Sequence, residues 1–275
     1  MKVEGKTALV AGASRGIGLA IARKLAAEGA HLVLPWFDWP EESEAMRHEF
    51  SEKNSGHIFV QADLRKKLDV KNVAEIIRRK RGILHILVNN IERGGMPVIH
   101  GSYDRGINKD QWQLEVETTL LAKHHLFENC YPLMQSAANA SIVNISSIAG
   151  LIGRSGPAGL IFSDGYAAAN RGVSSLTQTW ARLAAPNVRV NEIMLGLIDT
   201  RHGQHTRGWE KLTEEERTAL VNHTLLQRTG TPEEVAETVL FLVKDAAYMT
   251  GTVIRLDGGY LLGNEKIPPM PDGVL

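Results

Sequence analysis

Short apolar segments alternate with longer amphipathic segments along almost the whole chain. Seven apolar segments are predicted as strands, over Thr7–Ala11, Ala30–Leu34, His57–Gln61, Ile83–Asn89, Ser141–Ser146, Val188–Met194 and Val253–Asp257. Helical patterns lie between them, over Gly16–Glu28, Glu41–Lys53, Lys71–Arg81, Gln111–Met134, Tyr166–Ala185 and Pro232–Val243. This alternation predicts an α/β fold in which right-handed crossovers join parallel strands. Apolar runs such as Ile86-Leu87-Val88 lack polar alternation, so we expect helices on both faces of the sheet.

The length and the charge balance favour one large domain with a small ligand. Of the 275 residues, 31 are Lys or Arg and 31 are Asp or Glu, so the formal net charge is zero. No overall field would attract nucleic acid or an anionic membrane, and we expect neither as a partner. We predict one domain over residues 1–265 and an extended tail over Lys266–Leu275, in which Pro268, Pro269 and Pro271 exclude a helix.

The cysteine content and the N-terminus predict a cytoplasmic protein. Cys130 is the only cysteine, so no intramolecular disulfide can form, and its helical apolar surroundings favour a buried, inert thiol. The first predicted strand begins at Thr7, which leaves no room for a signal peptide, and no apolar run is long enough to cross a bilayer.

A glycine-rich turn joins the first predicted strand to the first predicted helix. It reads Ala11-Gly12-Ala13-Ser14-Arg15-Gly16-Ile17-Gly18. Glycines at these positions allow a sharp turn and close approach to a pyrophosphate, which the amides of the helix N-terminus would face. Three long loops, Ile91–Asp110, Ser147–Gly165 and Gly196–Leu225, follow strand ends where such folds bind ligands. The pattern predicts a Rossmann-type dinucleotide site at the carboxyl edge of the sheet.

Further segments resemble the short-chain dehydrogenase/reductase family, in the family's order and over nearly the whole chain. They are Asp63-Leu64, Asn89-Asn90, Asn144–Gly150, Tyr166–Asn170, Arg189-Val190-Asn191, Gly196–Thr200, Thr250-Gly251 and Asp257-Gly258-Gly259. The glycine spacing also resembles the family's, with Ala11 where Thr is usual. The resemblance implies a single-domain, doubly wound parallel sheet. It also implies an NAD(P)-dependent oxidoreductase that acts on a carbonyl or a secondary alcohol.

The same resemblance assigns the cofactor contacts. They are Gly12, Ser14, Arg15, Gly16, Ile17, Gly18, Asp63, Leu64, Asn89, Ile198 and Thr200. NAD specificity usually requires a carboxylate at the end of the second strand, but the residue there is Trp36. Asp38 lies slightly beyond and would suit a ribose, whereas Arg15 resembles the phosphate-binding Arg of NADP-using relatives. We expect NADP, with NAD as the alternative.

By resemblance, Tyr166 is the catalytic acid, Ser147 the polarising donor and Asn170 a contact to the nicotinamide ribose. Ser147 is preferred over Ser146 because it has the family's spacing to Gly150. The fourth residue after the Tyr is Lys in the family, where its charge lowers the pKa of the phenol. Asn170 carries no charge, so oxidation, which needs a phenolate, should suffer more than reduction, which uses a neutral phenol. Reduction is therefore the predicted direction.

Other positions depart from the family pattern. Thr119 stands where an Asn is usual, and Ile91-Glu92 replaces Ala-Gly, so Glu92 either brings a carboxylate toward the cofactor or swings into solvent. Lys123 lies one turn after Thr119 and would restore a cation if it faced the site. We expect instead that its side chain is solvated or lies at a subunit interface. These departures motivate an alternative function, a catalytically silent dinucleotide-binding sensor or supporting subunit.

Three further expectations concern metals, a lid and assembly. His202 and His205 lack a third ligand at metal spacing, so no metal site is predicted. Thr213 followed by Glu216 predicts the capped start of a helix, which is either a lid or a plain surface helix. The helices over 111–134 and 166–185 correspond to those that pair subunits in relatives, and a homodimer or homotetramer is predicted from their apolar residues Leu120, Leu121, Leu126 and Trp180.

Overall fold

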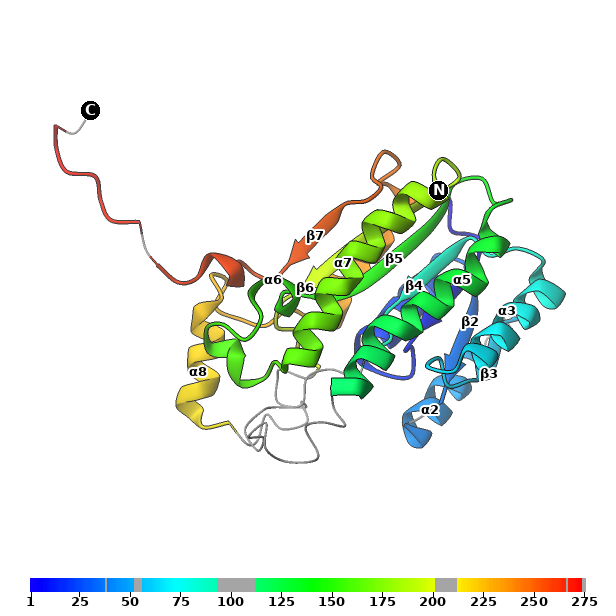
Figure 1. Cartoon of the computed structure of the whole chain (residues 1–275), viewed down its shortest axis with the longest axis horizontal. Coiled ribbons are helices and arrows are strands. Elements are labelled where there is room, and N and C mark those ends of the chain that lie inside the picture. The colour runs from blue at the N-terminus through cyan, green and yellow to red at the C-terminus, as the bar shows by residue number, and fades with distance from the viewer. Residues whose placement is uncertain (38, 52–55, 93–111, 201–211, 266, 274–275) are drawn as a thin grey trace.

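A computed structural model describes residues 1–37, 39–51, 56–92, 112–200, 212–265 and 267–273. One seven-stranded sheet forms the centre of the molecule, with every pair of neighbouring strands parallel and the order β3-β2-β1-β4-β5-β6-β7 (Figure 1). The strands are β1 (Thr7–Ala11), β2 (His31–Trp36), β3 (Ile58–Gln61), β4 (Ile86–Asn89), β5 (Ala140–Ser147), β6 (Val188–Leu195) and β7 (Val253–Leu256). The predicted single-domain, doubly wound sheet is therefore confirmed.

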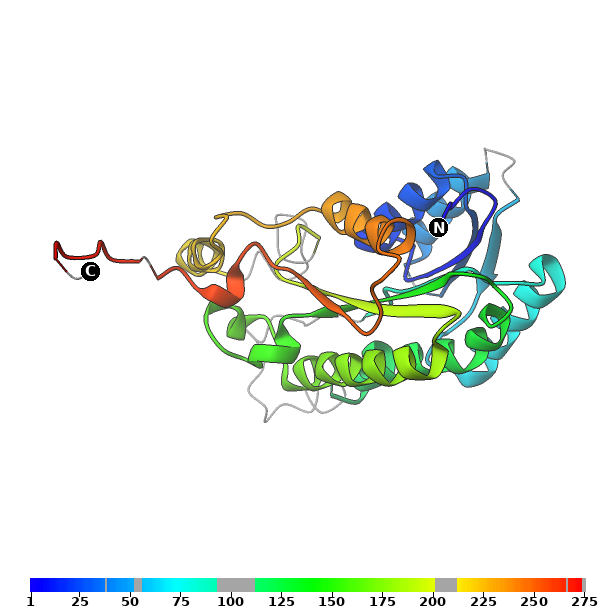
Figure 2. The same cartoon turned by 90° about the horizontal axis from the view of Figure 1, so that it is seen from above.

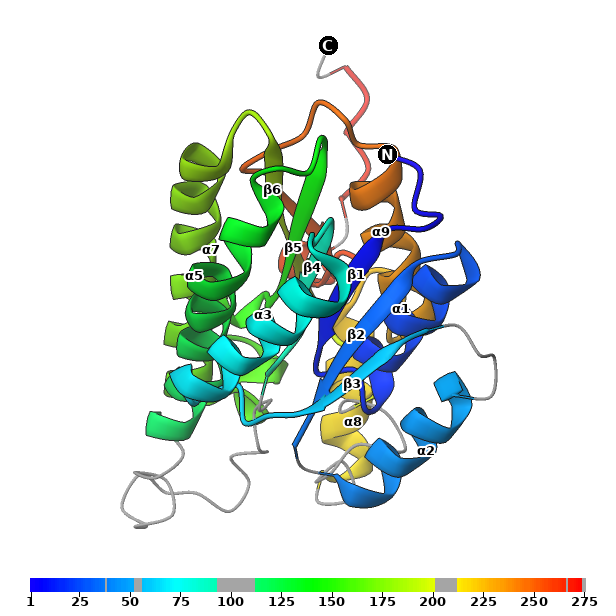
Figure 3. The same cartoon turned by 90° about the vertical axis from the view of Figure 1, so that its right-hand side faces the viewer.

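Helices cover both faces of this sheet (Figures 2 and 3). One face carries α1 (Gly16–Ala27), α2 (Pro40–Ser51) and α9 (Pro232–Lys244), and the other carries α3 (Lys67–Arg81), α5 (Ala122–Met134) and α7 (Asp164–Ala184). Each layer has its own buried cluster, with Ile21 and Val239 in the first and Ile77, Leu126 and Trp180 in the second. Burial from both sides explains why the central strands are apolar without alternation.

Element boundaries differ from the sequence prediction where the apolar pattern is weak. β4 begins at Ile86 rather than Ile83, and α3 begins at Lys67 rather than Lys71 because its first turn is charged and carries the exposed Leu68. The loop predicted over Ser147–Gly165 contains the short helices α6 (Ala149–Ile152) and η3 (Pro157–Leu160). The predicted long helix contains a π-helical stretch, η2 (Val116–Leu121). Periodicity of 3.6 residues gives no signal for such a stretch.

Two predictions about single residues are confirmed by the described structure. Cys130 is fully buried, and burial raises the pKa of its thiol to about 12, so it is inert. Thr213 caps α8 (Glu214–His223), where it accepts a hydrogen bond from the Glu216 amide and Glu216 accepts one from the Thr213 amide. Among the described residues, no helix is both long and apolar enough to span a membrane.

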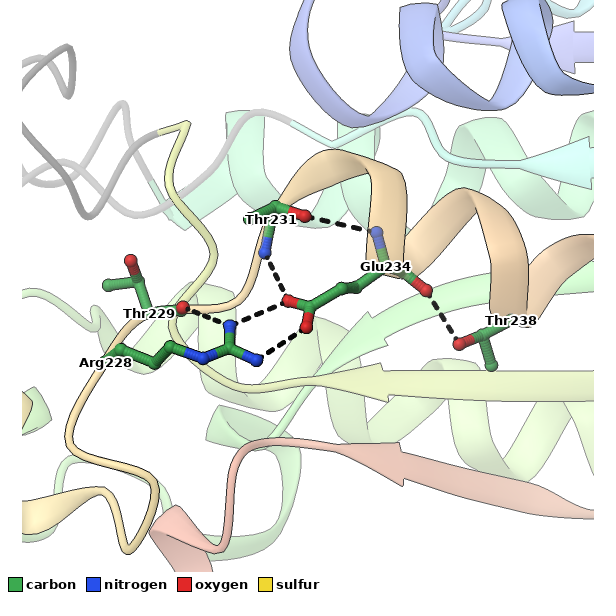
Figure 4. Close-up of polar contacts among 5 residues, drawn as sticks. All are labelled: Arg228, Thr229, Thr231, Glu234 and Thr238. Carbon is green, nitrogen blue, oxygen red and sulfur yellow. Dashed lines mark hydrogen bonds and ion pairs between the residues drawn. The ribbon is translucent and has the colours of Figure 1, made fainter.

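A polar cluster fixes the start of α9 beside the segment that follows β6 (Figure 4). Arg228 donates to both carboxylate oxygens of Glu234, at 3.0 and 2.6 Å, and Glu234 also accepts from the Thr231 amide at 2.8 Å. The Asp199 amide donates to the Gly230 carbonyl, and the Gly230 amide donates to the Leu197 carbonyl, both at 2.8 Å. Gly230, immediately before the cap residue of α9, therefore holds residues 197–199 in place.

Thr231→Ala is expected to lower the free energy of unfolding by about 1 kcal/mol, the usual loss for a helix cap. Thr231 accepts a hydrogen bond from the Glu234 amide, which alanine cannot do. Urea unfolding should show this loss, and the exposed Thr179→Ala, whose hydroxyl bonds only within α7, is the control. Equal stability of the two variants would contradict the role of the cap.

The same cluster makes the stability of the protein depend on pH in a known direction. The hydrogen bonds from Arg228 and then from the Thr231 amide lower the pKa of Glu234 from 4.5 to about 2. The stabilisation is therefore complete above pH 4.5 and is lost as the pH falls through about 2. Glu234 is partly exposed, so the contribution is small.

Candidate active site

The glycine-rich turn lies at the carboxyl edge, where the sheet order reverses beside β1. Gly12 has φ of +72° and accepts a hydrogen bond from Asn90 Nδ2 at 3.2 Å. A Cβ on Gly18 would lie 2.0 Å from the Gly12 carbonyl oxygen, so only glycine allows α1 to pack this closely on the turn. A Cβ on Gly16 would lie 3.1 Å from Thr200 Cγ2. The predicted contacts Gly12, Gly16, Gly18 and Thr200 are thus brought together.

Arginines and aromatic rings gather beyond the end of β2. Arg15 stacks on the Trp39 ring at 4.1 Å and lies 3.8 Å from Glu42, while Arg47 stacks on Trp36 at 4.5 Å. The guanidinium of Arg47 therefore lies against Trp36 near the end of the second strand, where the sequence has no carboxylate. Asp38, the other candidate, lies outside the described residues.

Asp63 and Ser14 are both buried and both engaged within the protein. Arg65 donates to the two oxygens of Asp63 at 2.8 Å, and this pairing holds the pKa of the carboxyl below its usual value. Ser14 Oγ lies 2.9 Å from Ser43 Oγ, which ties the glycine-rich turn to α2. Leu64 is buried beside Asp63 in the core of the α3 layer.

Tyr166 lies in the first turn of α7 and is 5% exposed. α7 begins two residues before the predicted start, because Ser163 caps it and accepts from the Tyr166 amide at 3.1 Å. The phenol packs in the same cluster as Ile148 and Ala149, which directly follow Ser147. The structure therefore brings Tyr166 close to the end of β5.

Ser146 and Ser147 differ in their hydrogen bonds. Ser146 donates its hydroxyl proton to Glu192, whereas Ser147 Oγ accepts from the Ala149 amide at 3.2 Å. A hydroxyl that accepts a hydrogen bond still has its own proton to donate. Ser147 is therefore the one of the two that is suited to polarise a carbonyl oxygen.

Asn170 lies one turn after Tyr166 and is completely buried. Its Nδ2 donates to the Tyr166 carbonyl at 3.0 Å, and its Oδ1 has no hydrogen-bond partner among the described residues. A buried acceptor without a partner is costly, so this oxygen is suited to a ligand hydroxyl.

Glu92 points toward the tyrosine, which decides between the two orientations left open by the sequence. Tyr166 donates its hydroxyl hydrogen bond to Glu92 Oε1 at 3.1 Å. The two residues are 74 positions apart in the chain, so no local pattern could have indicated this contact.

The expectation of a solvated or interface lysine at Lys123 is wrong. Its side chain is 0% exposed, and its Nζ donates to the Ile91 carbonyl at 2.7 Å and the Thr119 carbonyl at 2.9 Å. Thr119, at the predicted Asn position, is also buried, and its hydroxyl has no partner in the described part of the chain. The ammonium is thus inside the subunit, at the carboxyl edge of the sheet.

Sequence reasoning missed Glu192, a fully buried carboxyl group on β6. It accepts hydrogen bonds from Ser146 and, at 2.8 Å, from Ser174 on α7. Burial raises its pKa, although these hydrogen bonds and the charge of Lys123 oppose the shift. The signal available in the sequence was an acidic residue within an otherwise apolar strand.

Asn89 uses its side chain inside the sheet. Its Nδ2 donates to Asn144 Oδ1 at 2.8 Å, and Asn144 in turn donates to Thr177 at 2.8 Å. Ile198 is buried in the core cluster of the α1 and α9 layer, and Ile17 packs against this cluster. His202 and His205 lie outside the described residues, and the described ranges contain no cluster of metal-ligating side chains.

A parallel sheet with a glycine-rich turn, and a buried Tyr166 at the same edge as Ser147, is the arrangement of a dinucleotide-dependent oxidoreductase. Comparisons with known proteins agree. Residues 12–261 match the family described as enoyl-(acyl carrier protein) reductase.

Individual relatives match over nearly their full length. A 3-oxoacyl-[acyl-carrier-protein] reductase of Thermotoga maritima is 32% identical over 278 residues, covering 95% of this chain and 100% of the relative. A D-beta-hydroxybutyrate dehydrogenase of Rhizobium meliloti is 32% identical, covering 93% and 98%. A solved blue fluorescent protein from a metagenomic library, in complex with NADPH, has a TM-score of 0.78 at 26% identity, covering 94% and 99%. The chain belongs to the short-chain dehydrogenase/reductase family and is an oxidoreductase.

Proposed function

We propose that the protein reduces a ketone to a secondary alcohol with NADPH, and that the reverse oxidation is slower. Tyr166 donates a proton to the carbonyl oxygen and Ser147 polarises it by a second hydrogen bond. The observation that carries this proposal is the position of a buried Tyr166 hydroxyl beside the end of β5, where Ser147 keeps its proton.

The residues present fit a dinucleotide. The space left by the missing Cβ atoms of Gly12, Gly16 and Gly18 lets the chain lie close to a pyrophosphate, and Asn170 Oδ1 is a buried acceptor suited to a ribose hydroxyl. When bound, the reduced nicotinamide supplies the hydride. The same proposal includes the other predicted contacts, Ser14, Ile17, Asp63, Leu64, Asn89, Ile198 and Thr200, with Asn89 acting through its backbone because its side chain is used within the sheet.

The reduction is tested by adding NADPH or NADH and a panel of carbonyl compounds to the purified protein. Two relatives are named for 3-oxoacyl or β-hydroxybutyrate substrates, so 3-oxoacyl thioesters come first, followed by diketones and quinones. We expect the absorbance of the reduced nicotinamide to fall. Tight cofactor binding without turnover on the whole panel would instead favour the silent alternative, which the names of the relatives do not support.

Arg15→Ala is expected to weaken NADPH binding by about tenfold to a hundredfold and to leave NADH nearly unchanged. The guanidinium lies beside Trp39, where it can donate to a 2′-phosphate once it leaves Glu42. Fluorescence titration with both cofactors measures the change. The control is Arg23→Ala, on the helix that Arg15 precedes and paired with Glu49 on the surface. Equal losses for the two cofactors would place Arg15 outside the 2′-phosphate site.

We propose a homodimer or homotetramer, a cytoplasmic location, and the division into a domain over 1–265 and a tail over 266–275. Leu126 and Trp180 are buried within the subunit, Trp180 stacked on Phe127 at 4.4 Å, so they give no surface to a partner. Leu121, at 37% exposed, and Leu183 on α7, at 60%, remain as apolar contacts for a second copy. Residues 267–273 extend away from the body of the molecule (Figure 1).

A further inference from the structure

The carboxylate of Glu92 links a buried phenol to the outside of the protein. Tyr166 is almost completely buried, whereas Glu92 is partly exposed, and the two share the hydrogen bond of 3.1 Å. Glu92 follows β4 at the carboxyl edge, where the other proposed catalytic groups lie. A titratable group with one side toward solvent and one toward the phenol can pass protons between them.

Two hydrogen bonds hold the backbone that precedes Glu92 in place. The preceding carbonyl, of Ile91, accepts from the Lys123 ammonium at 2.7 Å, and the Asn90 side chain donates to the Gly12 carbonyl at 3.2 Å. Lys123 is itself fixed by the Thr119 carbonyl. The backbone before Glu92 is thus tied both to α5 and to the glycine-rich turn, and Lys123 is a positioning residue.

A negative charge on Glu92 would oppose the formation of a phenolate at Tyr166. If Tyr166 alone gave up its proton, a phenolate would form beside the Glu92 carboxylate, and two adjacent anions oppose each other. Asn170, one turn along α7, has no charge to offset them. A route that leaves Tyr166 neutral before and after the reaction avoids this cost.

We propose that Glu92 is the terminal acid and base of the reaction and that Tyr166 relays its proton. This inference rests on the proposed reductase function. In reduction, the carbonyl carbon gains a hydride, the C=O π pair moves to oxygen, and that oxygen takes the Tyr166 proton. The phenol oxygen takes the proton of the Glu92 carboxylic acid, and the resulting carboxylate is reprotonated by solvent. Oxidation reverses each step, with the Glu92 carboxylate as the base.

The relay gives pH profiles opposite to those of an isolated tyrosine. Reduction requires protonated Glu92, so its rate should fall as the pH rises, and its advantage over oxidation is expected on the acid side of the profile. Oxidation should be level through neutral and alkaline pH. An isolated phenol would give level reduction and an oxidation that rises into the alkaline range. Among the described residues, the charged groups on elements packed around the pair include Lys123 on α5, Glu115 one turn before Thr119, Asp164 in the first turn of α7, and Glu192 on β6.

The test compares wild type, Glu92→Gln, Glu92→Ala and the control Glu4→Gln, whose exposed side chain precedes β1 at the opposite edge of the sheet. We expect Glu92→Gln to lower kcat for reduction by about tenfold to a hundredfold and to change both pH profiles to those of an isolated phenol. Cofactor affinity should not change. Formate should restore part of the activity of Glu92→Ala, because a small carboxylic acid can occupy the vacated space. Wild-type profiles in Glu92→Gln would overturn the relay.

A second measurement needs neither cofactor nor substrate. Tyrosinate absorbance, with Tyr166→Phe subtracted to isolate this phenol, should show Tyr166 ionising in Glu92→Gln about one pH unit lower than in wild type. Identical titrations would overturn the proposal even if no substrate had been found. A shifted titration with no turnover would instead leave the pair intact and count against the reductase function alone.

Discussion

Tyr166→Phe is expected to lower kcat for carbonyl reduction by about 10²- to 10⁴-fold, the range for loss of a general acid. Phenylalanine keeps the ring that packs against Phe162 at 5.7 Å but removes the hydroxyl that transfers the proton to the substrate oxygen. The hydrogen bond to Glu92 is lost as well, so both parts of the proton route are interrupted. Cofactor affinity should be unchanged, because the side chain of Asn170 and the glycine-rich turn are untouched.

Steady-state kinetics and a cofactor titration measure the two parts of this expectation. Tyr248→Phe is the matched control, since Tyr248 is fully exposed and far along the chain from the site. If Tyr166→Phe retained more than about a tenth of the wild-type kcat, the proton would have to come from another group.

Gly18→Ala is expected to weaken dinucleotide binding by about a hundredfold or more, which corresponds to about 2.7 kcal/mol. The new Cβ would lie 2.0 Å from the Gly12 carbonyl oxygen and 2.7 Å from Asn90 Nδ2, and the first of these atoms is backbone that cannot rotate away. The turn must therefore move, and the amides that face the pyrophosphate move with it.

The control for this variant separates binding from general strain. Gly82→Ala introduces a Cβ at φ of +76° with nothing within 4 Å, after α3 and away from the turn. It should lower stability but leave cofactor affinity unchanged. Calorimetry measures the cofactor affinity of both variants, and circular dichroism confirms that they are folded. Wild-type affinity in folded Gly18→Ala would show that the turn does not hold the dinucleotide.

The fold was predictable because its signals are local. Each strand is a short apolar run between turn residues, and helices such as α1 and α9 carry a regular apolar face with glycine or a capping Thr at one end. Only part of the site can be predicted from local sequence patterns. Tyr166, Asn170 and the glycine-rich turn follow fixed spacings, and their relative placement follows from the strand order.

The remaining parts of the site depend on contacts between distant segments. The orientation of Glu92 is decided by a phenol 74 residues away, and the burial of Lys123 depends on a carbonyl 32 residues before it. Glu192 is stabilised by hydroxyls from β5 and α7. A periodic pattern shows which face of one helix or strand is apolar. It does not show which residues of another segment pack against that face.

Because residues 197–199 are attached to the start of α9, we expect the protein to lose activity at a lower temperature than the one at which its sheet unfolds. Leu197 and Ile198 are buried, and two main-chain hydrogen bonds at Gly230, immediately before the cap, join this segment to the start of α9. The sheet, by contrast, is supported by two full helical layers. A helix end opens more readily than a packed sheet, so heating would release this segment while the strands stay intact. Inactivation on heating would therefore precede the melting of secondary structure, and a thermal denaturation curve would overstate the temperature range in which the protein works.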